Sequence, residues 1–343
     1  MCSVMRKAAY PLALVWLVFL AAPVLANGDS GNIQRPADWE QGGTFNILFE
    51  NDLFFDTDRD YTNGVQLSYT TPPDRNLGWA VDLARMLPFF PQDGEVRTSY
   101  SIGQNIYTPS DITVANPPLT SRPYAGFLYG AIGLIADTGT ELDQLQVQLG
   151  VVGPASLAKE SQTFVHRIIR DRKPMGWHYQ LRDEPALLIT YDHTMKVLPR
   201  FDVLGFTADI EPHYGAAIGN VYDYINVGAM ARIGFNMADD YGPPRIEPAL
   251  PGSNFFESNG GIGAYIFAGV DGRAIGHNIF LDGNSFTTSR SVQRLPFVGD
   301  ATIGAAITVE GMRLAFSHVF RTREYRTQPG GDQFGSVSLT FRF

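Results

Sequence analysis

The chain has 343 residues, a formal net charge of −9 at pH 7, and 35 Gly, 23 Phe and 15 Tyr. This acidic balance argues against a nucleic-acid-binding surface. The one cysteine, Cys2, lies at the extreme N-terminus in a segment that we expect to be removed, which excludes disulfides and thiol catalysis from the mature chain.

The N-terminal segment 1–26 predicts a secretory signal peptide. Arg6 and Lys7 precede an apolar run over 8–24, and a small-residue cleavage site ends at Ala26. A retained membrane anchor is the alternative, although the run is short for a spanning helix, which needs ~20 apolar residues. We expect residues 27–343 to form a single exported domain.

After the signal, about twelve segments show strand character, several of them with the apolar–polar alternation of β-strands. In the first, Phe45, Ile47 and Phe49 are separated by single residues. Several segments reach the ~9–11 residues that a tilted strand needs to cross a bilayer. Bacterial outer-membrane barrels have an even number of strands. The twelve segments therefore predict an all-β fold, a 12-stranded antiparallel transmembrane β-barrel. The predicted strand cores are 44–52, 61–71, 96–107, 123–137, 142–153, 184–193, 203–216, 221–236, 261–276, 294–308, 311–321 and 334–343.

The last segment carries the strongest of these signals. Val337, Leu339, Phe341 and Phe343 alternate with polar residues, and Phe343 ends the chain. Such a strand resembles the assembly signal of outer-membrane barrels, so we expect the barrel assembly machinery to recognise it. The closing strand of a soluble β-sandwich is the alternative.

The lengths of the links predict which end of the barrel each one occupies, because short links face the periplasm and long ones the exterior in such barrels. The short links expected in the periplasm are 137–142, 219–221 and 308–311. The long links expected outside are 53–60, 108–122, 154–183, 237–260 and 277–293.

Two links predict helices. The link 72–95, which strand alternation places in the periplasm, has apolar residues at helical spacing from Leu77 to Leu87. Within the extracellular link 154–183, residues 156–170 predict a second short helix, which Pro174 and Gly176 would end. A helix in an outer loop of a barrel is unusual, so this predicted helix is a candidate for an element held over the lumen.

Two groups of side chains are candidates for chemistry. Gln162 and His166 are one turn apart on the predicted loop helix, so both face the same way, and His accepts protons near neutral pH. Asn51 and Asp52, with Asp56 and Asp58, supply hard oxygen donors that suit Ca²⁺, although their spacing is not that of an EF-hand. From the residues alone, an isolated surface histidine and a solvated acidic turn remain the alternatives.

Four ordered motifs together resemble the outer-membrane lipid A 3′-O-deacylase family, whose fold is a twelve-stranded barrel. They occupy about 120 residues, and beyond them the similarity extends to Phe343 as barrel pattern only. The motifs are Glu50-Asn-Asp-Leu-Phe with Asp58-Arg-Asp-Tyr-Thr-Asn-Gly64, Gln104-Asn-Ile-Tyr-Thr-Pro-Ser110, Arg122-Pro-Tyr-Ala-Gly126, and Gly150-Val-Val-Gly-Pro154 through Glu160-Ser-Gln-Thr-Phe-Val-His-Arg-Ile-Ile169.

The resemblance implies a Ca²⁺-dependent ester hydrolase with its site between lumen and outer leaflet. Asn51 and Asp52 match the pair near the family's metal, Thr62 matches its Tyr-Thr-x-Gly turn, and Gln162 and His166 match its loop helix. In the family mechanism the His activates a water, while Ca²⁺ polarises the ester carbonyl and stabilises the oxyanion. The implied substrate is the 3′ acyloxyacyl ester of lipid A in the lipopolysaccharide leaflet of a Gram-negative outer membrane.

One departure keeps other functions open. A characterised form of the family has a lysine just after the Tyr-x-Pro-Ser segment, where this chain has Ile112, Thr113 and Val114. Arg122 is a substitute cation to consider. The alternatives are therefore a phospholipase-like barrel hydrolase acting on another envelope lipid, and a barrel with a structural or binding role only, because a fold does not fix a function.

Overall fold

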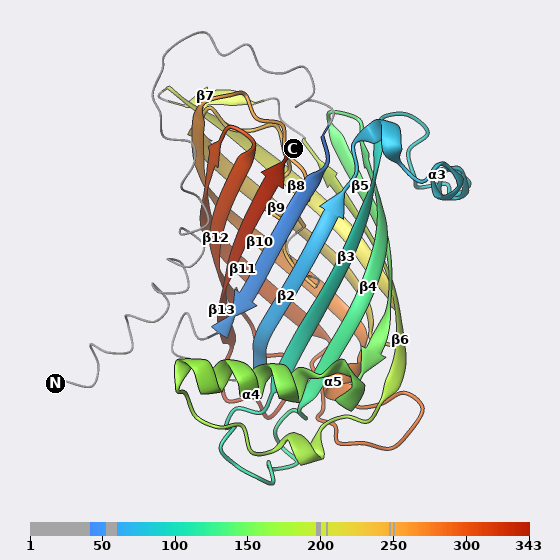
Figure 1. The fold of residues 1–343 in the computed structure, drawn as a ribbon, viewed down its shortest axis with the longest axis vertical. Coiled ribbons are helices and arrows are strands. Elements are labelled where there is room, and N and C mark those ends of the chain that lie inside the picture. Colours follow the sequence, from blue (N-terminus) through green and yellow to red (C-terminus); the bar gives the residue numbers. More distant parts are fainter. Residues whose placement is uncertain (1–41, 53–59, 197–199, 204, 247, 250) are drawn as a thin grey trace, which may run out of the picture.

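The computed structural model describes residues 42–52, 60–196, 200–203, 205–246, 248–249 and 251–343. The predicted signal peptide, Asp56 and Asp58 lie outside the described residues. Within them the chain forms one antiparallel β-barrel with helices at its two ends (Figure 1).

Twelve long strands make the barrel wall. Of the thirteen described strands, β7 (Phe201–Val203) is short and pairs only with β8, which leaves twelve in the ring. The first strand pairs with the last, and β6 pairs with β8, so the ring is closed. This confirms the predicted 12-stranded antiparallel barrel. The long strands are β1 (Thr44–Asn51), β2 (Asp60–Thr70), β3 (Glu95–Thr108), β4 (Ala125–Asp137), β5 (Glu141–Val152), β6 (Glu184–Met195), β8 (Phe206–Gly219), β9 (Tyr222–Phe235), β10 (Ile262–Asn278), β11 (Phe297–Val309), β12 (Met312–Arg321) and β13 (Asp332–Arg342).

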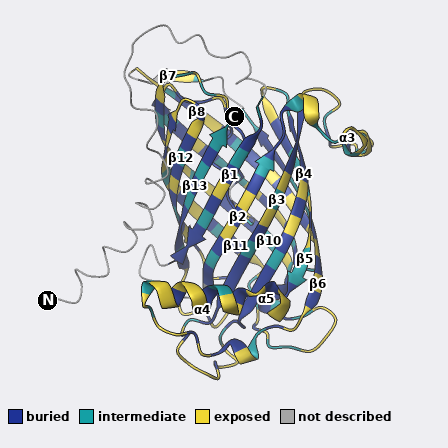
Figure 2. Cartoon of the chain, in the orientation of Figure 1, coloured by how far each residue is buried: buried dark blue, intermediate teal, exposed yellow. Residues whose placement is uncertain are grey.

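The wall has an apolar outside and a polar inside. Exposed and buried residues alternate along the strands (Figure 2), and the exposed ones include Ile47, Leu67 and Ile132. Charged residues point inward, where Arg232 Nη2 donates to Asp209 Oδ2 at 2.6 Å and to Glu211 Oε1 at 2.7 Å. An apolar exterior around a polar interior is the pattern of a barrel that sits in lipid.

The described helices lie at opposite ends of the barrel. Helix α3 (Gly78–Ala84) projects at the end that holds residue 343, while α4 (Ala158–Ile169) crosses the wall at the other end, called the α4 end below (Figure 1). Both predicted helices are confirmed. Among the described helices, none is long and apolar enough to cross a membrane.

The link 236–261 enters the lumen from the end opposite α4. Within the barrel, Arg245 Nε donates to Glu50 Oε1 at 2.7 Å, and Arg313 Nη2 donates to the Ser253 carbonyl at 2.8 Å. Asp240 accepts from both Arg232 and Arg313 and is fully buried. This link is called the luminal plug below.

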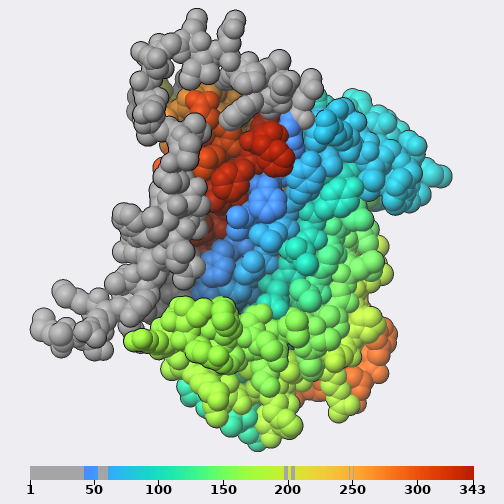
Figure 3. Space-filling model, viewed as in Figure 1, coloured from blue at the N-terminus to red at the C-terminus, as the bar shows by residue number. Residues whose placement is uncertain are grey.

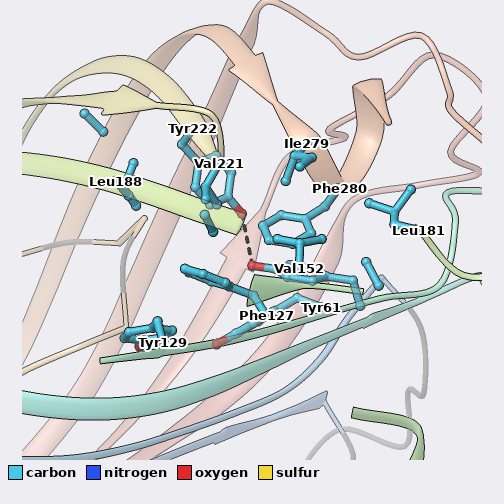
Figure 4. Close-up of a cluster of buried hydrophobic side chains, with 14 of the residues drawn as sticks. Tyr61, Phe127, Tyr129, Val152, Leu181, Leu188, Val221, Tyr222, Ile279 and Phe280 are labelled. Carbon is cyan, nitrogen blue, oxygen red and sulfur yellow. Dashed lines mark hydrogen bonds between the residues drawn. The ribbon is translucent and has the colours of Figure 1, made fainter. Parts of the chain in front are cut away.

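Aromatic side chains fill the barrel at the α4 end. Phe280 of helix α5 (Ile279–Asp282) stacks on Tyr107 with ring centroids 4.0 Å apart, and Phe127 and Tyr222 lie around it (Figure 4). The hydroxyl groups of Tyr107 and Tyr222 are 3.0 Å apart. The lumen is therefore packed from both ends.

Two of the predicted link positions are wrong. Strand alternation places the short link 219–221 at the α4 end, with the expected extracellular links, and the long link 237–260 at the opposite end, with 137–142 and 308–311. The length rule fails for 237–260 because the lumen encloses this link as the plug.

Candidate active site

Helix α4 lies against the outer wall of the barrel. Figures 1 and 3 show it crossing the wall from β4 toward β1. At its start, Gln104 Nε2 on β3 donates to the Ser156 carbonyl at 2.6 Å. Gly126 on β4 provides the room, because a Cβ there would stand 2.2 Å from Ala158 Cβ and 2.1 Å from Ser156 Oγ. The contact is on the outside, since Gly126 shares its strand face with the exposed Ile132.

The helix has one face toward the wall and one toward its surroundings. Gln162 and His166, one turn apart, are buried, whereas Phe164 and Ile168 are 60% and 63% exposed. The helix ends at Ile169 and Arg170 is its C-cap residue with φ 58°, so its end agrees to within one residue with the predicted range 156–170. The two candidate polar residues therefore point at the barrel, whereas Phe164 and Ile168 point away from it.

His166 is held in one tautomer. Its Nδ1 lies 2.7 Å from the Arg172 carbonyl oxygen, in the loop that follows the helix. A carbonyl only accepts, so Nδ1 carries the hydrogen and Nε2 keeps a lone pair when the ring is neutral. This leaves Nε2 as a proton acceptor.

Gln162 is oriented by a residue that sequence reasoning missed. Trp177, in the 3₁₀ turn η5 (Trp177–Tyr179), donates its indole Nε1–H to Gln162 Oε1 at 2.8 Å. Because an indole N–H only donates, the amide oxygen must face it. The amide nitrogen, Nε2 of Gln162, is buried with no hydrogen-bond partner among the described residues. The site thus presents an oriented donor with unused capacity.

The remaining candidates lie on the wall at the α4 end. Asn51 ends β1 on the same strand face as the exposed Ile47, yet only 6% of Asn51 is exposed. Thr62 sits at a register shift between β2 and β3, and its Oγ1 lies 2.7 Å from Thr108 Oγ1. Thr108 and Ile106 share one face of β3, and Ile106 packs with Ala158 of α4. Thr62 is therefore linked through Thr108 to the face of β3 that packs against α4, and Asn51 lies on the outer face of β1. This places α4 outside the barrel rather than over its lumen.

Asp52 directly follows β1 and is fully buried. Its carboxylate and the amide oxygen of Asn51 fit Ca²⁺ in kind, because this ion takes six to eight oxygen ligands. Among the described residues, no three His, Cys, Asp or Glu side chains gather to hold a metal ion. Asn51 and Asp52 therefore offer oxygen donors of the right kind, but fewer than the six to eight oxygens that Ca²⁺ takes.

Neither Ile112, at the position of the missing lysine, nor Arg122 supplies an exposed positive charge near the site. Ile112 is fully buried in a cluster with Tyr124 and Trp177, and Arg122 is fully buried with its Nη1 3.0 Å from Glu324 Oε2. Exposed basic residues follow His166 instead, at positions 167, 170, 172 and 173.

The histidines of the strands have partners within the wall. His193 Nδ1 lies 2.8 Å from Asp143 Oδ1, and His213 Nε2 lies 3.0 Å from Asp271 Oδ2. His318 Nε2 lies 3.3 Å from Gln333 Oε1. These side-chain contacts indicate structural roles for the three strand histidines and distinguish them from His166, which lies on the buried face of α4.

Comparison with known proteins adds the following. Residues 13–343 match the family model described as outer membrane protein LpxR. The structure of LpxR from Salmonella typhimurium is similar with a TM-score of 0.70 and 23% identity, covering 88% of this chain and 100% of that one. The β domain of the Bordetella autotransporter BrkA covers 88% of this chain and 100% of its own, at a TM-score of 0.45 and 10% identity. A search of the curated proteins finds no match.

Proposed function

Because the chain belongs to the family of the outer membrane protein LpxR, we propose that it is an outer-membrane ester hydrolase that removes the 3′-linked acyloxyacyl group of lipid A. The observation that carries this proposal is the pair on α4, a proton acceptor at His166 Nε2 beside the unused donor at Gln162 Nε2. Ester hydrolysis by water needs these two functions, a base for the nucleophile and a donor for the developing oxyanion.

In the proposed reaction, His166 Nε2 takes a proton from water as the water attacks the ester carbonyl. The Arg172 carbonyl accepts the hydrogen bond from Nδ1–H, at an Nδ1–O distance of 2.7 Å, and thereby stabilises the imidazolium that forms. The proton then passes to the departing alkoxide of the sugar, which restores the neutral ring. This sequence requires no serine or cysteine nucleophile.

Gln162 would donate from Nε2 to the carbonyl oxygen as it gains charge. Trp177 keeps the amide in the orientation that this requires, so the donor is fixed before the substrate arrives. Calcium, held by Asp52 and Asn51, would supply further charge stabilisation at this oxygen. Thr62, which is hydrogen-bonded to Thr108, would position the edge of β2 beside Asn51 and Asp52.

The surroundings of the pair suit an acylated, phosphorylated lipid. The exposed face of α4 is apolar at Phe164 and Ile168, which suits acyl chains. Arg167, Arg170 and Lys173 are exposed at the end of the helix and beyond, which suits phosphate groups. These basic residues would take the place of the absent family lysine.

Mass spectrometry of lipid A from Gram-negative cells that express the chain tests this proposal. The wild type should remove an acyloxyacyl unit, and His166→Ala should leave lipid A unchanged. His178→Ala is the matched control, because His178 is exposed in the same loop and contacts Tyr179. Heat-modifiable migration on gels should be the same for all three proteins.

Activity retained by His166→Ala would refute the role of general base. Unchanged lipid A with all three folded proteins would refute the lipid A substrate. In that case, phospholipids are the next substrate to test, because the buried Ile112 stands where a related enzyme has its lysine. The failure of both substrates would favour a non-enzymatic barrel.

A further inference from the structure

A groove of about 740 Å³ lies on the outer wall, away from α4. Its lining comes from β9, β10 and β11, which stand opposite β2–β4 in the ring order of the barrel. The sides are the exposed side chains of Ile225, Val227 and Phe297. The groove is therefore part of the lipid-facing surface and is separate from the candidate active site.

Glycine makes the floor of this groove. Gly272 on β10 and Gly299 on β11 lie in register with one another on paired strands. A Cβ at Gly272 would meet only the Val227 carbonyl oxygen, 3.8 Å away, and a Cβ at Gly299 would meet nothing closer than 3.8 Å. Since neither backbone requires glycine for a positive φ, the missing side chains serve to leave space.

A positive charge borders the groove at the α4 end. Arg323 follows β12 in the link to β13, is exposed, and contributes to the groove lining beside Thr322 and Leu295. No ion pair of its side chain is found within the described residues. An apolar groove that ends at an arginine is complementary to a lipid whose acyl chain is attached to a phosphate-bearing headgroup.

We propose that this groove binds one lipid A molecule of the surrounding outer leaflet, with an acyl chain over Gly272 and a phosphate at Arg323. The location favours lipid A over a phospholipid, because the groove opens at the same end as the proposed outer-leaflet site. The bound lipid would be structural and would remain attached while other molecules enter under α4.

The test is native mass spectrometry of the full-length mature barrel, extracted from outer membranes in a mild detergent and partly delipidated. The wild type should retain lipid A. Gly272→Leu should lose one equivalent, because the leucine occupies the groove. Gly130→Leu is the matched control, since Gly130 is an exposed outward position on β4 where a Cβ meets only the Ser101 carbonyl oxygen at 3.8 Å.

A second pair of variants tests the charge. Arg323→Gln should lower retention at least severalfold, whereas Arg326→Gln, an exposed arginine in the same link outside the groove lining, should leave it unchanged. Equal lipid A retention by Gly272→Leu and Gly130→Leu would overturn the proposal, as would retention of a phospholipid in place of lipid A. Deacylase assays of the same proteins separate this result from the proposed function, because a failed deacylase leaves the retention comparison intact.

Discussion

At the scale of single residues, two hydrogen bonds orient the candidate side chains of α4. Both partners come from the loop after the helix, Arg172 through its carbonyl and Trp177 through its indole. The sequence could predict Gln162 and His166 because helical spacing places them on one face. It could not predict Arg172 or Trp177, since their positions depend on an aperiodic loop that folds back beneath the helix.

Replacing Trp177 with Phe should lower kcat/KM about fivefold, because the hydrogen bond that orients Gln162 contributes roughly 1 kcal/mol. Tyr124→Phe is the control. It removes a hydroxyl from the same aromatic cluster, where Tyr124 donates to the Ile112 carbonyl at 3.1 Å. Deacylation kinetics in mixed micelles measure both, and equal losses would show that Trp177 contributes packing only.

Asp52→Asn should raise the Ca²⁺ concentration for half-maximal activity by at least about tenfold, because calcium affinity follows the number of charged ligands. Excess Ca²⁺ should restore activity. Asp111→Asn is the control, since Asp111 is an exposed carboxylate at the same end whose hydrogen bonds from Thr113 lower its pKa. Titration with chelator-buffered Ca²⁺ gives the comparison, and an unchanged Ca²⁺ dependence of Asp52→Asn would refute its role as a ligand.

At the scale of elements, the sequence specified the strands well because each has to turn apolar side chains to lipid at every second position. The positions of the links were harder to predict. The length rule put 237–260 outside and 219–221 in the periplasm, whereas counting strands in order would have reversed both. The packing of α4 against the outer wall could not be predicted either, because it depends on the absence of a side chain at Gly126.

Gly126→Val should displace the start of α4 and lower activity by about a hundredfold, since a shift of 1 Å at a catalytic group has an effect of that order. The barrel itself should still fold, because the added methyl groups meet Ser156 and Ala158 outside it. Gly130→Val, on the same face of β4, should retain activity. Mass spectrometry of lipid A measures the activity of both variants, and gel migration reports whether their barrels fold. An active Gly126→Val would contradict the prediction, because it would show that activity does not depend on close packing of α4 at Gly126.

At the scale of the whole molecule, the luminal plug ties the barrel together through buried charge pairs. Burial alone raises the pKa of Asp240, but Arg232 and Arg313 outweigh it and the pKa is lowered. A carboxyl with a lowered folded-state pKa contributes stability above its unfolded value of about 3.9. This contribution is lost as the pH falls through the folded-state pKa.

Asp240→Asn should therefore lower the free energy of unfolding at pH 7 by about 3–5 kcal/mol, as expected when one partner of a buried pair is removed. The difference in unfolding free energy between wild type and variant should narrow below about pH 4, where Asp240 of the unfolded chain begins to gain its proton while the folded carboxyl, with its lowered pKa, is still ionised. Asp239→Asn is the control, with a 55% exposed side chain paired to Lys196. Urea unfolding at several pH values tests this, and a gap that does not change with pH would contradict it.

The position of α4 on the outside of a filled barrel also determines how a substrate arrives. The proposed substrate never needs to leave its leaflet or pass through the protein, because it meets the helix by sideways diffusion in two dimensions. The rate should then follow the surface density of the substrate, its mole fraction among the surrounding lipid or detergent, rather than its concentration in the bulk solution. Adding inert detergent at a constant amount of lipid A should slow the reaction by surface dilution alone.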